Sequence, residues 1–201
     1  METSGRHSDC CELYVDCKAT SVCSGTAEGR ALAPGFGKLC KTEDSRDCLV
    51  NDMKVCLVGS SGGHLTHLYM LKPFWQDKER FWVTFDKEDA RKLLEGERVY
   101  PCYYPTNRNF WNLLRNTRIA WKVLKKEKPD LIISTGAAVA VPFFYLGKLR
   151  GSKLIYIEVF DRIDKSSLTG KLVYPIADKF IVQWEEMKKI YPKAVNLGSI
   201  F

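Results

Sequence analysis

A glycine-rich turn between an apolar segment and a helical segment is the clearest sign of chemistry in this chain. Val55 to Val58 form a short apolar run, and Gly59, Ser60, Ser61, Gly62, Gly63 and His64 follow directly. Leu65, Leu68 and Leu71 then recur at helical spacing. Glycines let a backbone approach a ligand closely, and the first N–H groups of a helix attract anions. The pattern predicts a phosphate-binding turn between the first strand and the first helix; the alternative is a tight structural turn.

The spacing of this turn matches neither of the two commonest phosphate-binding motifs. It lacks the Gly-Lys-Ser/Thr of a P-loop, and Gly-x-x-Gly-Gly departs from the dinucleotide pattern Gly-x-Gly-x-x-Gly. Asp86 ends the second apolar segment, roughly where the ribose-binding acid of a dinucleotide site would stand. An NAD-dependent Rossmann oxidoreductase is therefore one alternative.

Two histidines follow the glycines. His64 opens the predicted helix, where its imidazole would project toward a ligand in the turn. The positive end of a helix lowers the pKa of an imidazole, and the neutral ring can act as a general base. We predict catalysis or substrate contact for His64. His67 lies one turn later and could share that face, although a structural role is favoured for it.

Polar residues also follow two later apolar segments. Glu158 stands at the end of one of them, and Thr135 and Gly136 follow its neighbour. Open α/β sheets bind ligands at the carboxyl ends of their strands. We predict a catalytic role for Glu158 and substrate binding by Thr135, Gly136, Arg162, Ser166, Ser167 and Thr169, as well as by the glycine turn. The alternative is loop structure, with Ser167 or Thr169 capping the next helix.

From residue 53 onward, short apolar segments alternate with helical ones. The predicted strands cover 54–59, 81–85, 99–104, 130–134, 153–157 and 179–183; the predicted helices cover 64–75, 87–95, 109–126, 138–149 and 169–177. This alternation implies βαβ units and a parallel sheet with helices on both faces. The prediction is one Rossmann-like α/β domain over residues 53–201.

Residues 1–52 differ in composition from the rest of the 201-residue chain. They hold six of the eight cysteines, and 6 Lys and Arg against 9 Asp and Glu, with no sustained apolar period. We expect a disordered leader or a non-native extension, without a disulfide framework or a metal site. No apolar run approaches the roughly 18 residues of a membrane span, and no signal-peptide pattern opens the chain. The expected location is the cytoplasm.

Residues 53–201 carry 25 Lys and Arg against 15 Asp and Glu, an excess of ten positive charges. The excess favours an anionic partner, although a solvated basic surface would also explain it. The helical segment 109–126 interleaves aromatic and basic residues, which suits an anionic membrane surface as well as packing on a sheet. Nucleic-acid binding is not expected, because no helix-turn-helix, zinc finger or stacking motif occurs.

Three further segments, together with Ser60-Ser61-Gly62-Gly63-His64, resemble a known family. They are Ser134-Thr135-Gly136, the stretch from Tyr156 through Arg162 to Lys171, and Tyr174-Pro175-Ile176-Ala177-Asp178 with Val182-Gln183-Trp184. These segments look like the split glycosyltransferase subunits of the PssD type in bacterial exopolysaccharide synthesis. They also resemble the eukaryotic asparagine-linked glycosylation subunit, number fourteen of its pathway. The resemblance covers residues 53–201.

The resemblance implies the N-terminal, acceptor-binding half of a GT-B glycosyltransferase. A separate donor-binding subunit would hold the UDP-sugar, and the active site would lie between the two chains. The implied reaction is inverting transfer of a sugar to a polyprenyl-diphosphate-linked saccharide, in polysaccharide or lipid-linked oligosaccharide synthesis, with no metal and no cofactor. The glycine turn would hold the acceptor diphosphate, and His64 would act as the base.

One departure from the family concerns the membrane. The eukaryotic relative has an N-terminal membrane helix, whereas this N-terminus is polar. We therefore expect peripheral attachment to the cytosolic face of a membrane. A non-catalytic, membrane-recruiting scaffold for a catalytic glycosyltransferase partner is a further alternative.

Overall fold

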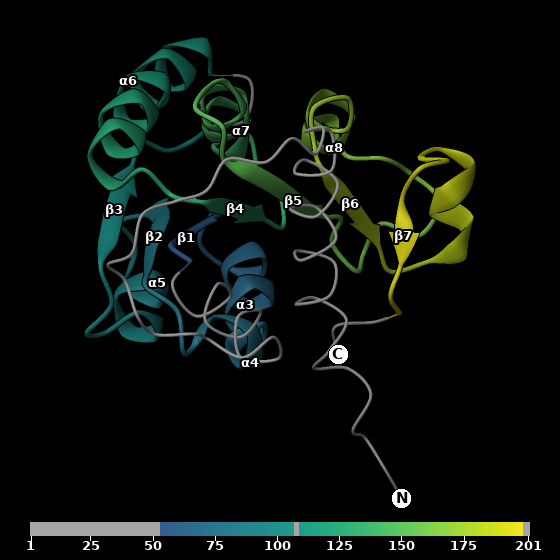
Figure 1. Ribbon diagram of the computed structural model, residues 1–201, viewed down its shortest axis with the longest axis horizontal. Coiled ribbons are helices and arrows are strands. Elements are labelled where there is room, and N and C mark those ends of the chain that lie inside the picture. The colour runs from purple at the N-terminus through teal and green to yellow at the C-terminus, as the bar shows by residue number, and fades with distance from the viewer. Residues whose placement is uncertain (1–52, 107–108, 199–201) are drawn as a thin grey trace, which may run out of the picture. The chain divides into compact units, whose positions relative to one another are not determined.

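The computed structural model describes residues 53–106 and 109–198, and the described strands form one parallel sheet (Figure 1). Their order across the sheet is β3-β2-β1-β4-β5-β6-β7. The strands are β1 (Val55–Val58), β2 (Arg80–Phe85), β3 (Val99–Cys102), β4 (Leu131–Ser134), β5 (Lys153–Ile157), β6 (Lys179–Val182) and β7 (Val195–Asn196). The predicted Rossmann-like α/β fold is confirmed. The predictions made for residues 1–52 fall outside the described residues.

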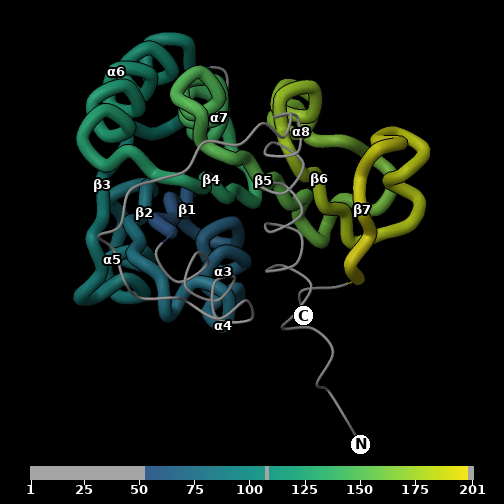
Figure 2. The backbone as a smooth tube through the Cα atoms, in the orientation of Figure 1, coloured from purple at the N-terminus to yellow at the C-terminus, as the bar shows by residue number. Residues whose placement is uncertain are grey.

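Helices cover both faces of the sheet (Figures 1 and 2). One face carries α3 (Gly63–Met70), α4 (Lys72–Trp75) and α5 (Glu88–Leu93); the other carries α6 (Phe110–Glu127), α7 (Ala140–Leu149) and α8 (Leu168–Val173). The central strands β1 and β4 are buried along their whole length, so both of their faces read as apolar. A sheet covered in this way explains why these strands appear as continuous apolar runs rather than alternating patterns.

The winding direction of the chain reverses between β1 and β4. The chain runs outward from β1 to β3, returns through α6 to β4 beside β1, and then continues to β7 (Figure 2). Val58 pairs with Ser134 at the carboxyl edge of these two strands. The loop after β1 leads to α3 on one face, and the loop after β4 leads to α7 on the other. Such a switch point leaves a crevice in which open α/β sheets bind their ligands.

The helix predicted over 64–75 is in fact two helices. It breaks at Leu71, whose φ of −76° and ψ of 15° are not helical, and α4 begins at the next residue. Pro73 stands in the first turn of α4, a position where its missing N–H costs no hydrogen bond, whereas inside a continuous helix it would cost one. The predicted helix was too long because the apolar spacing continues past Pro73.

Two elements near the end of the described chain were not predicted. The 3₁₀ helix η1 (Glu185–Lys189) and the two-residue strand β7 follow β6. Both are too short to show a helical or strand period in the sequence. The last predicted helix is also shorter than expected, because α8 ends at Val173 rather than at Ala177.

A buried carboxylate joins α6 to the amino edge of the sheet. Glu127, near the end of α6, accepts hydrogen bonds from Lys54 Nζ (3.1 Å), Arg98 Nη1 (3.1 Å) and the Tyr100 hydroxyl. Burial opposes ionisation of Glu127, but the bonds from Tyr100 and Lys54 outweigh it, so the pKa of this carboxyl lies below its usual value. This cluster fixes the far edge of the sheet, away from the switch point.

We predict that Glu127→Ala lowers the free energy of unfolding by about 2–4 kcal/mol, because two cations and a hydroxyl lose their shared partner. A carboxyl whose pKa is lowered by folding stabilises above its unfolded pKa and loses this effect as the pH falls. The difference from wild type should therefore be full at pH 7 and shrink below about pH 4. Urea denaturation measures it. Glu88→Ala, which removes an exposed pair with Lys92, is the control and should change stability by less than about 1 kcal/mol.

Candidate functional site

A large cavity opens at the switch point. Its volume is about 810 Å³, within the range of ligand-binding pockets. The start of α6, the start of α7 and the segment from Tyr156 to Leu172 form most of its wall, and His64 lines it from the β1 side. Most of the wall is apolar, including Leu113, Val141 and Leu172. The cavity therefore suits a ligand with a substantial apolar or ring-shaped part.

His64 is fixed across the switch point by two hydrogen bonds to Thr135. Its Nδ1 lies 2.9 Å from the Thr135 carbonyl oxygen, and the Thr135 hydroxyl donates to the His64 carbonyl oxygen at 2.7 Å. A carbonyl oxygen only accepts, so Nδ1 must carry the proton. In the neutral ring, Nε2 then has a free lone pair. The sequence predicted a site for both residues, and the structure shows that Thr135 orients His64.

The chemical state of His64 follows from its surroundings. Burial lowers the pKa of its imidazole below the usual 6.5, and this effect outweighs the opposing bond to Thr135. The neutral form therefore dominates at pH 7. A neutral imidazole with Nδ1 protonated and Nε2 free is the form that a general base requires.

Gly136 makes room for the His64 ring. A Cβ built at this position would lie 2.7 Å from Cε1 of His64 and 3.2 Å from the Tyr156 hydroxyl. Its φ of 126° is also one that other residues rarely adopt. Gly136 was predicted to bind substrate; what the structure shows is that its missing side chain allows His64 to stand beside Tyr156.

The glycine turn itself is only partly open to a ligand. Gly62 adopts a φ of 81°, and its N–H donates to the Asp89 carboxylate of α5 at 2.7 Å. Gly59 N–H is bonded to the Val83 carbonyl oxygen. The predicted residues Gly59, Ser60, Ser61 and Gly62 do not line the cavity, and Gly63 lines a second, smaller hollow beside it. The anion that the turn contacts in this structure is thus a carboxylate of its own chain.

A smaller hollow adjoins the cavity at His64. Its volume is about 340 Å³, and its wall consists of Gly63, His64 and His67 from α3 and Val159 to Arg162 after β5. His64, Val159 and Arg162 line both hollows. The His64 ring can therefore be approached from either hollow.

Glu158 lies behind the cavity wall rather than in it. It is 1% exposed, and its Oε2 accepts hydrogen bonds from the Ser167 hydroxyl (3.1 Å) and the Tyr191 hydroxyl (3.4 Å). Burial raises the pKa of this carboxyl. Gly170 packs against the same oxygen, and a Cβ there would also stand 2.6 Å from the Tyr191 hydroxyl. Glu158 therefore holds the Ser167 and Tyr191 side chains in position and does not itself line the cavity.

Ser167 has no hydrogen-bonding capacity left for a ligand. Its single hydrogen goes to Glu158, while its oxygen accepts from the Gly170 N–H (2.9 Å) and the Tyr156 hydroxyl (3.2 Å). It also caps α8, as the alternative reading of the sequence allowed. Ser166, Thr169 and Arg162, which were predicted to bind substrate, line the cavity, and Arg162 is half-buried.

Sequence reasoning did not identify Tyr156, Tyr191 or Asp89 as parts of the site. Tyr156 and Tyr191 are almost fully buried, so in the sequence they resemble ordinary core aromatics. Asp89 stands in α5, 27 positions from Gly62. No local signal points to any of them, because each takes its role from residues far away in the chain.

Asp86 does not form a ribose site. Both of its oxygens are bonded by Arg91, at 2.6 and 2.8 Å. The hollow that Asp86 lines, about 200 Å³ beneath α5, is separate from both hollows at His64 and contains no residue of the glycine turn. Nothing in this geometry favours the dinucleotide alternative.

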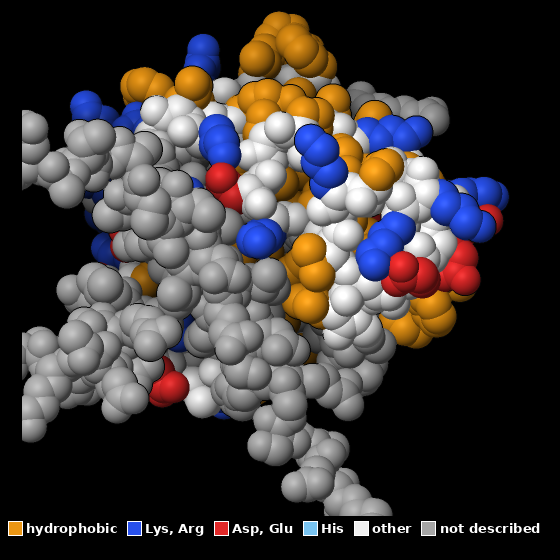
Figure 3. All heavy atoms as spheres, turned by 45° about the vertical axis from the view of Figure 1, so that its right-hand side comes forward, with side chains coloured by type: hydrophobic (Ala, Val, Ile, Leu, Met, Phe, Trp, Pro, Cys, Tyr) orange, Lys and Arg blue, Asp and Glu red, His pale blue; other side chains and the backbone are white. Residues whose placement is uncertain are grey.

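Apolar side chains stand exposed around the mouth of the cavity. Phe110 (66% exposed) and Trp111 (73%) begin α6, and Leu168 (75%) begins α8; Phe110 and Leu168 also line the cavity. Figure 3 shows hydrophobic side chains gathered along one side of the molecule, with lysines and arginines among them. None of the described helices has both the length and the apolar character that crossing a membrane requires.

Solved structures with a similar fold include MurG and a UDP-N-acetylglucosamine 2-epimerase. The crystal structure of MurG from Acinetobacter baumannii matches with a TM-score of 0.56 and 17% identity, over 67% of this chain and 42% of that one. UDP-N-acetylglucosamine 2-epimerase from Rickettsia bellii matches with a TM-score of 0.57 and 18% identity, over 74% and 45%. This chain therefore spans less than half the length of either solved chain. The likeness shows a fold shared with part of these GT-B enzymes, and their different names show that the fold does not fix the reaction.

Sequence comparisons point to one family. Residues 103–200 match the family described as "Oligosaccharide biosynthesis protein Alg14 like". The human protein named "UDP-N-acetylglucosamine transferase subunit ALG14" is 28% identical over 179 residues, covering 74% of this chain and 83% of that protein. The Candida albicans protein of the same name is 42% identical over 81 residues, or 37% of each chain. The matched segments include Thr135, Gly136 and the stretch from Tyr156 to Thr169. The part of the chain that matches is thus similar to the Alg14-like family, and the chain is a distant homologue of the ALG14 subunits.

Proposed function

We propose that this chain is one subunit of a two-chain, inverting glycosyltransferase that transfers N-acetylglucosamine from its UDP donor to a polyprenyl-diphosphate-linked sugar. The observation that carries the proposal is His64, held by Thr135 with Nδ1 protonated and Nε2 free beside a cavity of about 810 Å³. Similarity to the Alg14-like family and the names of the relatives support the transferase class and the sugar.

The proposed chemistry at His64 is a single displacement. Nε2 takes the proton from a hydroxyl of the acceptor sugar while that oxygen bonds to the anomeric carbon of the donor. The bond from this carbon to the diphosphate oxygen breaks, UDP leaves with the electron pair, and the anomeric configuration inverts. Arg162, Ser166 and Thr169 in the cavity wall would contact the acceptor diphosphate. The glycine turn, whose Gly62 N–H is already bonded to Asp89, would mainly place His64.

The donor-binding part would come from a second chain. The human relative of this chain is named as a transferase subunit, which supports a separate partner chain. The remainder of a GT-B fold would close over the carboxyl edge of the sheet. The isolated chain is therefore expected to be inactive.

The exposed apolar rim of the cavity would lie against a membrane. Phe110, Trp111 and Leu168 stand at the mouth, and Arg115 and Arg118 follow on α6. An amphipathic surface of this kind binds the headgroup region of anionic bilayers. A polyprenyl acceptor could then enter the cavity from the cytosolic face of the membrane. A membrane-recruiting scaffold without chemistry is the second candidate, since this rim would serve it equally well.

We predict that His64→Asn in the reconstituted pair of chains lowers kcat by about 10²–10⁴. The asparagine amide can still donate to the Thr135 carbonyl oxygen, as Nδ1 does, but it offers no base where Nε2 stands. The wild-type pH profile supplies the second readout. Because burial lowers the pKa of His64 below 6.5, kcat/KM should fall to half of its maximum only at a pH below 6.5.

Thr66→Ala, an exposed change two residues further along α3, is the control for His64→Asn and should leave turnover unaltered. Near-normal turnover of His64→Asn would rule out the base and favour the scaffold.

Gly136→Ala tests the space beside the imidazole. The added methyl group would meet Cε1 of His64, so we expect at least a tenfold loss of kcat. Gly151→Ala is a matched control: Gly151 has a φ of 85°, but a Cβ there meets nothing within 4 Å. Both variants carry backbone strain of about 1–2 kcal/mol, and only Gly136→Ala should lose activity. Equal activity of the two would contradict the geometry proposed for His64.

Trp111→Ala should weaken binding of the full chain to vesicles rich in phosphatidylserine by about tenfold, because an aromatic side chain no longer enters the interface. Sedimentation with vesicles measures this. Ile190→Ala removes an exposed apolar side chain that follows η1 and should have no effect. If the two variants bound the vesicles equally well, the proposed contact between α6 and the membrane would be wrong.

A further inference from the structure

The smaller hollow is not used by the acceptor in the proposal above. It shares His64, Val159 and Arg162 with the large cavity, but Gly63, His67, Phe160 and Asp161 belong to it alone. A displacement at His64 brings two sugar rings together, one carrying the attacking hydroxyl and one carrying the anomeric carbon. Two hollows that meet at His64 provide a separate place for each ring.

The charges of the smaller hollow do not favour a diphosphate. Arg162 contributes one positive charge and Asp161 one negative charge, and their Nε and Oδ2 atoms lie 4.0 Å apart. Burial lowers the pKa of both His64 and His67, so both rings are neutral at pH 7. The side chains of the hollow are therefore neutral in sum and rich in both hydrogen-bond donors and acceptors. A dianion would gain little there, whereas a neutral ligand with several hydroxyl groups would find partners.

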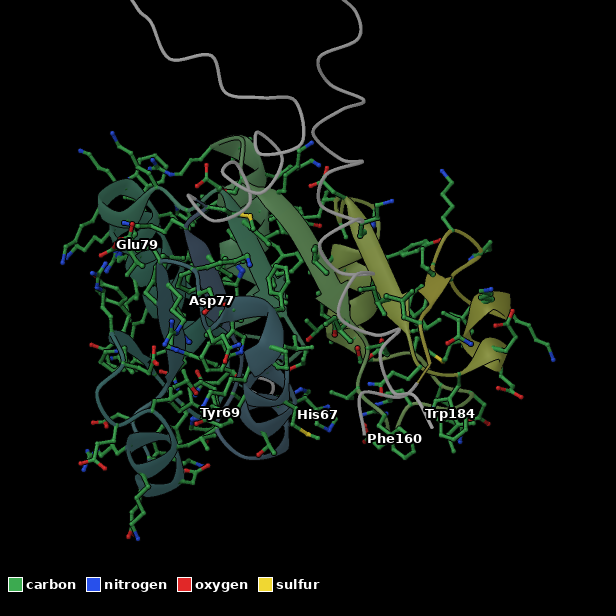
Figure 4. The ribbon with its side chains drawn as sticks, turned by 60° about the horizontal axis from the view of Figure 1, so that its bottom comes forward. His67, Tyr69, Asp77, Glu79, Phe160 and Trp184 are labelled. Carbon is green, nitrogen blue, oxygen red and sulfur yellow. The ribbon has the colours of Figure 1, made fainter. Side chains whose placement is uncertain are left out.

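An aromatic ring completes the wall. Phe160 is 37% exposed and packs at 4.9 Å between centroids on Trp184, whose indole N–H donates to the Phe160 carbonyl oxygen at 2.7 Å. Figure 4 shows His67 on α3 and Phe160 after β5, with Trp184 beyond Phe160. Trp184 thus supports Phe160 from the side away from His67. A supported, partly exposed aromatic ring offers an apolar surface to the C–H face of a sugar.

We infer that the smaller hollow is a sugar subsite, in which a pyranose ring packs on Phe160 and hydrogen-bonds Asp161 and Arg162. Its volume of about 340 Å³ lies at the lower end for ligand pockets, which suits one ring rather than an extended ligand. The inference rests on the proposed transferase function. It adds that this chain binds sugar in both of the hollows that His64 lines, whether the ring in the smaller hollow comes from the nucleotide donor or from the lipid-linked acceptor.

Asp161→Asn and Phe160→Leu test the subsite in the full chain. The probe is methyl β-N-acetylglucosaminide, with binding followed by saturation-transfer NMR. Loss of a charged hydrogen-bond acceptor should weaken binding about tenfold or more, and loss of the aromatic face about two- to tenfold. Asp164→Asn and Ile163→Leu change exposed neighbours that do not line the hollow and should bind like wild type. The Asp161 side chain is 73% exposed, so its variant should keep the thermal midpoint of wild type.

The reconstituted pair then identifies the ring. A higher KM for UDP-N-acetylglucosamine with Asp161→Asn assigns the subsite to the donor, and a higher KM for the lipid-linked acceptor assigns it to the acceptor. The inference is overturned if Asp161→Asn and Phe160→Leu match their controls in probe binding and in both KM values. A pair that transfers no sugar at all would instead contradict the proposed function, and binding of the probe by this chain would still be measurable.

Discussion

The site depends on the reciprocal hydrogen bonds between His64 and Thr135. These residues follow different strands, and their contact exists because β1 and β4 lie side by side with Val58 opposite Ser134. One bond fixes the ring nitrogen that carries the proton, and the other fixes the backbone that carries the ring. A carbonyl acceptor settles the tautomer without adding charge, so burial can lower the pKa of His64. His64 lines both hollows. The bonds to Thr135 therefore set which tautomer of the imidazole a ligand in either hollow meets.

Two glycines create the space that this arrangement needs. Gly136 admits the His64 ring beside the Tyr156 hydroxyl, and Gly170 admits the Glu158 carboxyl beside the Tyr191 hydroxyl. Tyr156 and Ser167 in the wall and Glu158 behind it form a chain of hydrogen bonds that ties the start of α8 to β5. Buried polar groups are costly unless they are paired, so such a chain defines one arrangement of the wall and opposes others. The stabilising Glu127 cluster lies at the opposite edge of the sheet, which separates it from the chemistry.

Much of the fold could be predicted from local patterns. The central strands are buried on both faces and appear as apolar runs, and the long helix α6 shows a strong helical period. The break at Leu71 and the elements η1 and β7 were missed. A proline at a helix start resembles one that interrupts a helix, and elements of two to five residues are too short to have a period. Both failures come from the small number of residues that carry each signal.

The sequence by itself determined which residues reach the carboxyl edge. His64, Thr135, Gly136, Glu158 and Arg162 all follow strands of one parallel sheet, so chain order alone places them at the same edge. Only the tertiary structure decided their roles. Glu158 lies behind Ser167, whose hydrogen-bonding groups are all occupied. The Gly62 N–H donates to Asp89. Phe160 and Asp161 line a second hollow. The physical reason is that spacing sets which strand end a residue occupies, whereas hydrogen-bond partners and free space are set by residues that are distant in the chain.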